Sequence, residues 1–275
     1  MDEVILGAVV YELEVEQGGS VPGFAGRLLH AGLFHLLQQI SPELSAELHD
    51  GENVKPFAVS PLIGHEPPCR MIYEKEPRMV KAGTRFFWRV SAWRTDVVEA
   101  LLAIPAGAAL RIGQLDCRIV RVQADGQRAS GLARVDDLLA AAFSQPFQRE
   151  VAFHFRSPVA FRRDRYDYPL PEPRLVFASL ADKWHQAHLP GMIDRSRIGE
   201  LAEEIYPIDW QGRTQRVYFG QKYGLCGFVG DFTYSLRALD EESAGIVTLL
   251  AQFATFSGTG RMTGQGFGQT RVTGR

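Results

Sequence analysis

The order of strand and helix patterns repeats along the chain, and this repeat constrains the fold more than any single motif. In the first half, apolar periodicity predicts a strand, a helix, three strands, a helix and a strand, at residues 4–15, 21–40, 57–64, 70–75, 84–93, 95–104 and 115–123. The second half returns to this order with two central strands instead of three, at residues 149–161, 173–188, 215–224, 225–238, 240–257 and 268–273. We therefore expect two structural units of one kind.

Each unit follows the order β-α-β-β-α-β, which is that of a ferredoxin-like (RRM-like) domain. We predict an α+β fold with two tandem ferredoxin-like domains, at residues 1–147 and 148–275. A chain of 275 residues is long enough for two domains of about 130 residues. The boundary falls in the stretch FSQPFQRE, and no long linker or low-complexity segment separates the halves.

A short helix directly follows the first long one. Ser41 and Pro42 are residue types suited to the N-cap and to the first helical position, so this second helix begins where the first one ends. It ends near the pair Leu48-His49. The first helix carries one apolar stripe, formed by Leu29, Leu33, Leu36, Leu37 and Ile40.

Charge, cysteines and hydropathy exclude several classes of protein. The net charge of −2 and the pI near 6.4 argue against general attraction to nucleic acid, although a local basic surface is compatible with them. Cys69, Cys117 and Cys226 form no CxxC pair, so we expect neither a disulfide scaffold nor structural zinc, and we place the chain in the cytoplasm. No signal peptide and no apolar run of 18 residues is present, so we expect no membrane association.

Residues 257–272 read SGTGRMTGQGFGQTRV and contain no acidic residue. The run lies between a helix and a strand, the reverse of a P-loop or a dinucleotide fingerprint, and it lacks the Gly-Lys-Ser/Thr ending. Glycines allow another backbone to approach closely, and Arg261 and Arg271 add positive charge, which suits a phosphodiester chain. The alternative is a tight connection whose glycines serve turns only. The glycines are Gly258, Gly260, Gly264, Gly266 and Gly268.

Arginines gather at the first strand of the second unit and in the loop after it. Guanidinium groups suit phosphate oxygens and stack on bases, so this cluster is a candidate RNA-binding surface. Asp164 and Asp167 are interleaved, which also fits a solvated loop. The aromatic run at 86–88 does not form the RNP motif and is expected to be core. The arginines are Arg156, Arg162, Arg163 and Arg165.

Histidines raise the question of a metal. In the stretch WHQAH, His185 and His188 are three residues apart on a predicted helix, and His154 lies on a predicted strand. Neither an HExxH glutamate nor a carboxylate at a recognised spacing accompanies them. A helix C-terminus, where histidines interact favourably with the dipole, explains the pair, and we expect no metal and no cofactor.

The end of the chain resembles the C-terminal glycine-rich signature of the RAMP superfamily, in particular of the CRISPR-associated Cas-six endoribonucleases. The order GFVGDFTYSL, helix, FATFSGTGR is similar to theirs, as is the stretch SPELSAELHDGENVKPFAVSPL, in which a helix ends in Leu-His before a lysine and a strand. RSPVAF followed by YPLPEPRLVFASLADKW resembles the start of their second domain. The resemblance covers most of the chain in the expected order.

This resemblance implies metal-independent cleavage of precursor CRISPR RNA within its repeats, by attack of the 2′-OH on the adjacent phosphate, leaving 2′,3′-cyclic phosphate and 5′-OH ends. His49 stands at the position of the family's catalytic histidine and Lys55 at that of its lysine. An imidazole can act as base or acid near neutrality, while a helix-terminal histidine favoured by the dipole is the alternative for His49. The site is implied to bind CRISPR repeat RNA, with effector-complex subunits and a second copy of the chain as further possible partners.

One position departs from the family pattern. Where the family often has a tyrosine on the first long helix, this chain has Phe34, beside His35. If the chain reverses at 40–41, His49 returns to the level of residues 33–35, so His35 is a tentative third participant, with an exposed surface histidine as the alternative. His30 is expected to be a packed or capping residue.

Two other functions are compatible with the sequence. The Phe34 departure leaves open a non-catalytic RNA-binding subunit of a CRISPR ribonucleoprotein. A tandem ferredoxin-like metabolic or regulatory binding protein is the unrelated alternative.

Overall fold

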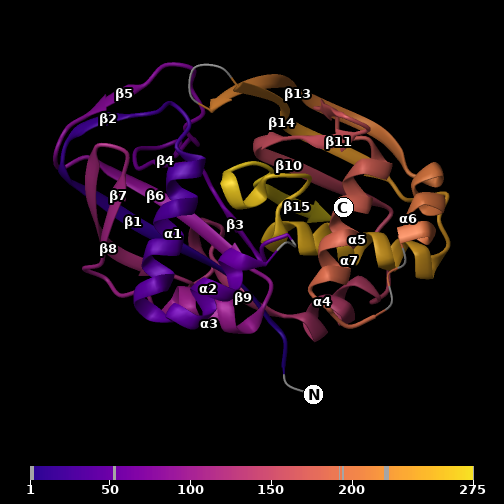
Figure 1. Cartoon of the computed structure of the whole chain (residues 1–275). Coiled ribbons are helices and arrows are strands. Elements are labelled where there is room, and N and C mark those ends of the chain that lie inside the picture. The colour runs from indigo at the N-terminus through magenta and orange to yellow at the C-terminus, as the bar shows by residue number, and fades with distance from the viewer. Residues whose placement is uncertain (1–2, 52–53, 192, 194, 220–222, 275) are drawn as a thin grey trace.

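The chain folds into two antiparallel sheets that lie side by side, each covered by helices (Figure 1). The structure is a computed structural model, and it describes residues 3–51, 54–191, 193, 195–219 and 223–274. No helix in these ranges is both long and apolar enough to span a lipid bilayer.

The first sheet is built by the N-terminal half and has the strand order β3-β6-β1-β8-β7. Strand β4 also pairs with β6, and β9 pairs with β1. A separate two-stranded ribbon is formed by β2 and β5. The strands are β1 (Ile5–Gln17), β2 (Gly19–Val21), β3 (Phe57–Val59), β4 (Ile63–Gly64), β5 (Arg78–Val80), β6 (Arg85–Ala92), β7 (Ala109–Ile112), β8 (Leu115–Gln123) and β9 (Gly131–Arg134). The helices are α1 (Gly26–Ile40), α2 (Pro42–Asp50), α3 (Thr95–Ala103) and α4 (Val135–Ala142), with a 3₁₀ turn η1 (Gln127–Ala129).

The second sheet has the order β13-β14-β10-β15, and β11 and β12 form a small ribbon beside it. Its strands are β10 (Glu150–Val159), β11 (Phe161–Arg163), β12 (Tyr166–Tyr168), β13 (Tyr206–Phe219), β14 (Tyr223–Ser235) and β15 (Thr270–Gly274). Its helices are α5 (Pro173–Gln186), α6 (Arg195–Leu201) and α7 (Glu241–Ser257), with 3₁₀ turns η2 (Ala202–Glu204) and η3 (Thr263–Gln265).

Both sheets contain the ferredoxin-like arrangement. The run β8-β1-β6-β3 in the first sheet and the run β15-β10-β14-β13 in the second place the last, first, third and second strands of each unit side by side. The predicted α+β fold with two tandem ferredoxin-like units is therefore confirmed.

Several local predictions were wrong. The strand expected at 70–75 does not form, and Met71 makes only an isolated bridge to Ile63. The strand expected at 215–224 begins nine residues earlier, at Tyr206, while residues 220–222 of it lie outside the described ranges. By contrast, Ser41 is the N-cap residue of α2 and Pro42 begins the helix, as predicted, although the Ser41 side chain makes no capping hydrogen bond.

Each sheet packs its helices around its own apolar core. On β1, the alternate residues Val9, Tyr11 and Leu13 face α1 and α3, because successive side chains of a strand point to opposite faces. In the second half, aromatic rings fill the space between the sheet and the helices α5 and α7. They are Phe153, Phe155, Phe177, Trp184, Tyr234 and Phe253.

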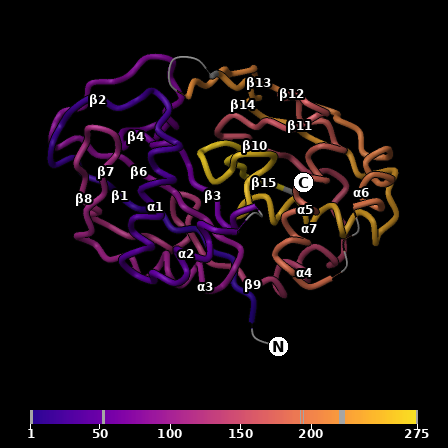
Figure 2. The backbone as a smooth tube through the Cα atoms, in the orientation of Figure 1, coloured from indigo at the N-terminus to yellow at the C-terminus, as the bar shows by residue number. Residues whose placement is uncertain are grey.

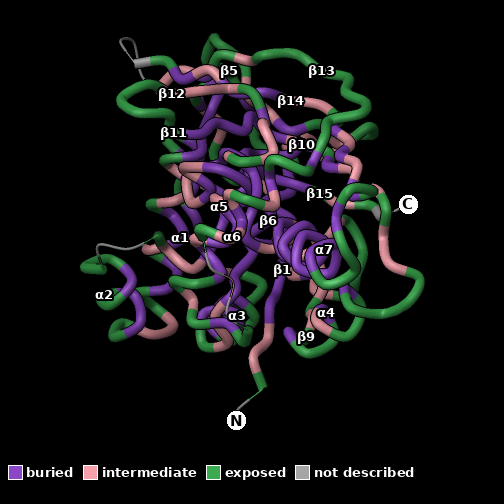
Figure 3. The backbone as a smooth tube through the Cα atoms, turned by 90° about the vertical axis from the view of Figure 1, so that its right-hand side faces the viewer, coloured by how far each residue is buried: buried purple, intermediate pink, exposed green. Residues whose placement is uncertain are grey.

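Helix α7 contacts strands of both sheets, namely β1, β3 and β6 of the first and β10 and β15 of the second. It is buried along most of its length (Figure 3). Leu6, Ala58 and Trp93 of the first half belong to the core that surrounds it. The chain after α7 then passes next to α1 and β3 (Figure 2), so the glycine-rich run lies between the two units.

Side chains from elsewhere bind the last carbonyls of α7, which have no partner within the helix. Arg89 on β6 donates to the Thr255 carbonyl at 2.8 Å. Lys183 on α5 donates to the carbonyls of Ser257 at 3.1 Å and Gly258 at 2.8 Å. Ser91, also on β6, donates to the carbonyl of Phe256 at 2.6 Å. Burial lowers the pKa of Arg89 to about 10 and that of Lys183 to about 7.

Candidate active site

His49 lies in the last turn of α2 with its side chain 76% exposed. Its Nδ1 is 3.4 Å from the Asp50 carboxylate. Lys55 follows a few residues later and closes the end of this helix, since its Nζ donates to the carbonyls of His49 at 3.1 Å and Gly51 at 2.6 Å. An ammonium group has three donors, so one N–H of Lys55 is not used by these two bonds. The structure thus brings His49 and Lys55 together.

Phe34 on α1 packs edge-to-face against His49, with ring centroids 5.7 Å apart. On its other side the same ring contacts His30, one turn earlier on α1, at 5.0 Å. Phe57 on β3 supports both rings. Phe34 is therefore an apolar spacer between two imidazoles.

His30 is held in one orientation by the glycine-rich run. Its Nδ1 lies 2.7 Å from the Gly264 carbonyl, and because a carbonyl only accepts, Nδ1 carries the hydrogen. Nε2 of the neutral ring is then an acceptor. Burial lowers the pKa of His30, the hydrogen bond to Gly264 opposes this, and the charges of Lys55 and His49 lower it further.

His35 is not brought into this cluster. It lies on the exposed side of α1, where its Nε2 is 2.9 Å from the amide nitrogen of Gln39. His30, which the sequence predicts to be a packed or capping residue, packs against Phe34 and Phe57 and is the histidine that lies next to this cluster instead of His35. The missing information was the contact with Gly264, which lies 234 residues further along the chain.

The protein's own packing accounts for most glycines of the run. Gly258, Gly260, Gly266 and Gly268 have φ of 63°, 74°, 94° and 62°, a region that other residues rarely adopt. A Cβ at Gly260 would lie 2.4 Å from the Ala160 carbonyl oxygen, and one at Gly268 would lie 2.0 Å from that of Thr259. Gly264 differs, because a Cβ there would meet the His30 ring at an ordinary 3.6 Å.

Arginines predicted to bind RNA fall into two separate groups. Arg162, Arg163 and Arg165 lie exposed on the β11–β12 ribbon, where Arg162 is 3.5 Å from Asp167 and Arg163 is 3.4 Å from Glu172. Arg261, from the glycine-rich run, also pairs with Asp167. The interleaved acidic residues therefore occupy part of this cluster.

The second group lines a cleft between the two halves. Two adjoining pockets of about 660 and 400 Å³ share Cys69, His154 and Arg156. Burial, and then the charge of nearby Arg271, lower the pKa of Arg156. Five arginines line this cleft: Arg70, Arg128, Arg156, Arg213 and Arg271. We call it the arginine cleft.

The candidate metal ligands are dispersed. His154 Nδ1 is 2.5 Å from the Asp231 carboxylate. His185 and His188 are exposed at the end of α5. Across the described ranges, no three His, Cys, Asp or Glu side chains are grouped as a metal ion requires.

Comparisons with known proteins agree with this architecture. The family model for CRISPR-associated endoribonuclease Cas6 matches residues 153–270, and the model for the CRISPR Cas6 N-terminal domain matches residues 15–136. The CRISPR-associated endoribonuclease Cas6 of Mycobacterium tuberculosis is 25% identical over 199 residues, which is 70% of this chain; the match spans 61% of that protein's length.

Solved structures extend the similarity over the whole chain. A Cas6 product complex has a TM-score of 0.76 and 29% identity, with 98% of this chain and all of the other covered. A Thermus thermophilus Cas6 gives 0.72 and 27%, with 99% and 100% covered. A RAMP protein at 15% identity and a TM-score of 0.62 shares the fold. Because the two family models together match most of the sequence, this chain belongs to the Cas6 family, the Cas-six endoribonucleases.

Proposed function

We propose that this protein cleaves precursor CRISPR RNA within its repeats, without a metal, by attack of the ribose 2′-OH on the adjacent phosphate. The products would carry 2′,3′-cyclic phosphate and 5′-OH ends. The observation that carries this proposal is the grouping of His30, Phe34, His49 and Lys55 at the junction of the two domains. Two imidazoles and an ammonium group are the groups that such a transesterification needs.

His30 suits the role of general base. Its lowered pKa keeps the ring neutral at pH 7, and the bond from Nδ1 to Gly264 leaves Nε2 to accept the proton of the 2′-OH. His49 is exposed to solvent and would donate a proton to the leaving 5′-oxygen. The unused N–H of Lys55 would stabilise charge on the phosphorane.

The rest of the repeat would be held mainly through its phosphates. The arginine cleft supplies fixed positive charge between the two domains, and the exposed arginines of the β11–β12 ribbon supply more. Arg261 and the glycine-rich run would act chiefly by fixing His30 and the junction, since Arg261 already pairs with Asp167. We retain the domain boundary near residue 147, the cytoplasm as the compartment, and effector subunits or a second copy as partners, as further parts of this proposal.

A matched set of histidine variants tests the mechanism. Labelled repeat RNA in EDTA should be cut at one position, and replacing the ribose at that position by its 2′-deoxy form should abolish cutting but not binding. We expect His30→Ala and His49→Ala to lower the single-turnover rate by about 10²-fold or more, whereas His35→Ala should stay within about twofold. Parental rates for His49→Ala would refute the catalytic assignment.

The second candidate is a non-catalytic RNA-binding subunit. The apolar ring of Phe34, at the position where the resemblance implies a tyrosine hydroxyl, favours it. Binding of the repeat without cleavage would support this alternative, and neither binding nor cleavage would refute both functions.

A further inference from the structure

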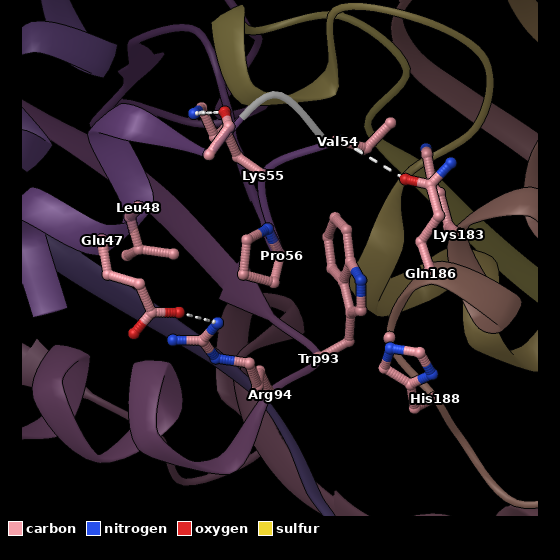
Figure 4. A pocket seen from close by; sticks show the side chains of 12 residues that line it. Glu47, Leu48, Val54, Lys55, Pro56, Trp93, Arg94, Lys183, Gln186 and His188 are labelled. Carbon is pink, nitrogen blue, oxygen red and sulfur yellow. Dashed lines mark hydrogen bonds and ion pairs between the residues drawn. The ribbon is translucent and has the colours of Figure 1, made fainter.

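A second hollow lies beside the proposed catalytic residues, and none of the roles assigned above uses it. It has a volume of about 300 Å³ and lies between the end of α2, the end of β6 and the last turn of α5 (Figure 4). Most of its wall is apolar. The apolar lining consists of Leu48, Val54, Pro56, Trp93 and Ala187. We call it the Trp93 pocket.

Trp93 is only 2% exposed, and its ring packs edge-to-face against Phe253 with centroids 6.0 Å apart. Figure 4 shows the indole nitrogen on the side of the ring turned toward Gln186 and His188. The indole N–H is therefore a fixed donor at the wall of the pocket.

Two further polar groups converge on the same space. The Gln186 carbonyl oxygen accepts from the Val54 backbone N–H at 3.3 Å, which leaves the amide nitrogen free to donate. His188 is exposed at the mouth of the pocket, and its backbone has a positive φ of 52°. The pocket thus offers apolar walls and several donors to a flat molecule that carries acceptor atoms on its edge.

Most charged groups at the rim are already paired. Arg94 donates to the Glu47 carboxylate at 2.7 Å, Lys183 binds backbone carbonyls, and Lys55 does so with two of its three N–H groups. Among the described residues that line the pocket, there is no unpaired carboxylate to hold a cation and no unpaired guanidinium to hold an anion. A neutral heterocycle fits best, and 300 Å³ is at the small end of ligand pockets, suited to one ring system.

The surroundings connect this pocket with the path of an RNA strand. Lys55, which binds the backbone of His49, also lines it. A second pocket of about 250 Å³ shares Val54, Lys183 and Gln186 with it. That pocket is lined by three arginines, each of which also pairs with a carboxylate of Asp167 or Asp182: Arg162, Arg195 and Arg261. Single-stranded RNA is commonly recognised through bases that turn out of the strand and stack on side chains.

We propose that the Trp93 pocket takes one nucleobase of the repeat RNA, turned out of the strand within a few nucleotides of the scissile phosphate. This rests on the proposed function, because the chain must bind repeat RNA. The base would lie against the indole and proline walls, with its acceptor edge toward the Trp93 and Gln186 donors. The pocket would then help to set which phosphate reaches His49.

Abasic substitution, one nucleotide at a time on both sides of the cleavage site, tests this proposal. We expect one abasic position to lower kcat/KM of the wild-type protein about tenfold, as loss of a stacked base does. Gln186→Ala, His188→Ala and Trp93→Phe should lower kcat/KM on intact RNA and lose their sensitivity to that abasic position. His185→Ala, on the same helix but outside the lining, should behave as wild type.

Binding by the His49→Ala protein gives a readout that does not depend on cleavage. Two results would overturn the pocket proposal and leave the proposed function standing. In the first, the wild type cuts intact repeat RNA but no abasic position lowers kcat/KM. In the second, a pocket variant and the abasic substitution each lower kcat/KM independently, so that their fold-losses multiply. If the wild type cuts no RNA, the same combinations of pocket variant and abasic substitution are compared by their RNA affinity. Losses of binding free energy that do not add would then support the pocket. Absence of binding would overturn both. Unfolding curves show whether Trp93→Phe remains folded, and the two rim variants test the pocket without altering the core.

Discussion

The glycine-rich run offers a direct test of whether its glycines serve packing or RNA. Gly268 has a φ of 62°, and a Cβ there would lie 2.0 Å from the Thr259 carbonyl oxygen. That oxygen belongs to backbone that cannot rotate away. Gly268 also accepts from the Thr259 N–H and donates to the Pro158 carbonyl, both at 2.9 Å. Gly268→Ala must therefore adopt a strained conformation and displace two hydrogen-bonded segments.

The expected loss in the free energy of unfolding follows from these contacts. Left-handed backbone costs a non-glycine residue about 1 to 2 kcal/mol, each of the two disturbed hydrogen bonds costs about 1 kcal/mol, and we expect a total of about 3 to 4 kcal/mol. Gly264→Ala is the matched control, because its φ is ordinary and its nearest neighbour would be the His30 ring at 3.6 Å. For this variant we expect a change below about 1 kcal/mol.

Urea unfolding followed by circular dichroism measures both variants, and RNA affinity is then measured on protein that is folded. If Gly268→Ala folded as stably as the wild type and instead lost RNA binding, the packing argument would be refuted. Equal destabilisation by Gly264→Ala and Gly268→Ala would also contradict it, since only one of them meets backbone.

Three further outcomes follow from the titratable and charged groups. Because burial lowers the pKa of His30, the acid limb of kcat/KM against pH should fall below pH 6.5, and a limb above 6.5 would exclude His30 as the base. Between pH 7 and 10.5 the unfolded chain holds a proton on Lys183 that the folded chain lacks. The free energy of unfolding should therefore rise with pH by at most about 1.4 kcal/mol per unit, and Lys183→Met should remove this slope in urea titrations at several pH values. Arg271→Gln should weaken RNA binding and reduce the slope of log Kd against log salt concentration by about one. Arg111→Gln, which is exposed and lies outside the arginine cleft, should leave both the affinity and the slope unchanged.

Local periodicity was sufficient to predict the main helices and the order of both sheets. The leucines of α1 and the alternation in β1 carry that signal because each element buries one face. Prediction from periodicity failed where an element buries few residues or is short. Strand β13 begins with exposed residues from Tyr206 onward, β9 spans only four residues, and α4 spans only eight.

The site was only partly predictable for a different reason. His49 and Lys55 are six residues apart, so a local motif identifies both. His30 depends on Gly264, and the Trp93 pocket depends on α5, contacts that span the two halves of the chain. Sequence patterns describe neighbours within an element, whereas these contacts exist only after the two sheets have docked.

The carbonyl groups at the end of α7 have a consequence for any attempt to dissect this protein. Two of their partners, Arg89 and Ser91, belong to the first half, and the third, Lys183, belongs to the second. A fragment that begins near residue 148 would keep the helix but leave the carbonyls of Thr255 and Phe256 without these donors. The complementary fragment would keep the bonds of Arg89 within the first half but lose its acceptors Thr255 and Gln269. Although the two units have the same strand order, we expect them to unfold together in one transition of the whole chain. We expect each isolated fragment to fold only when it is mixed with the other.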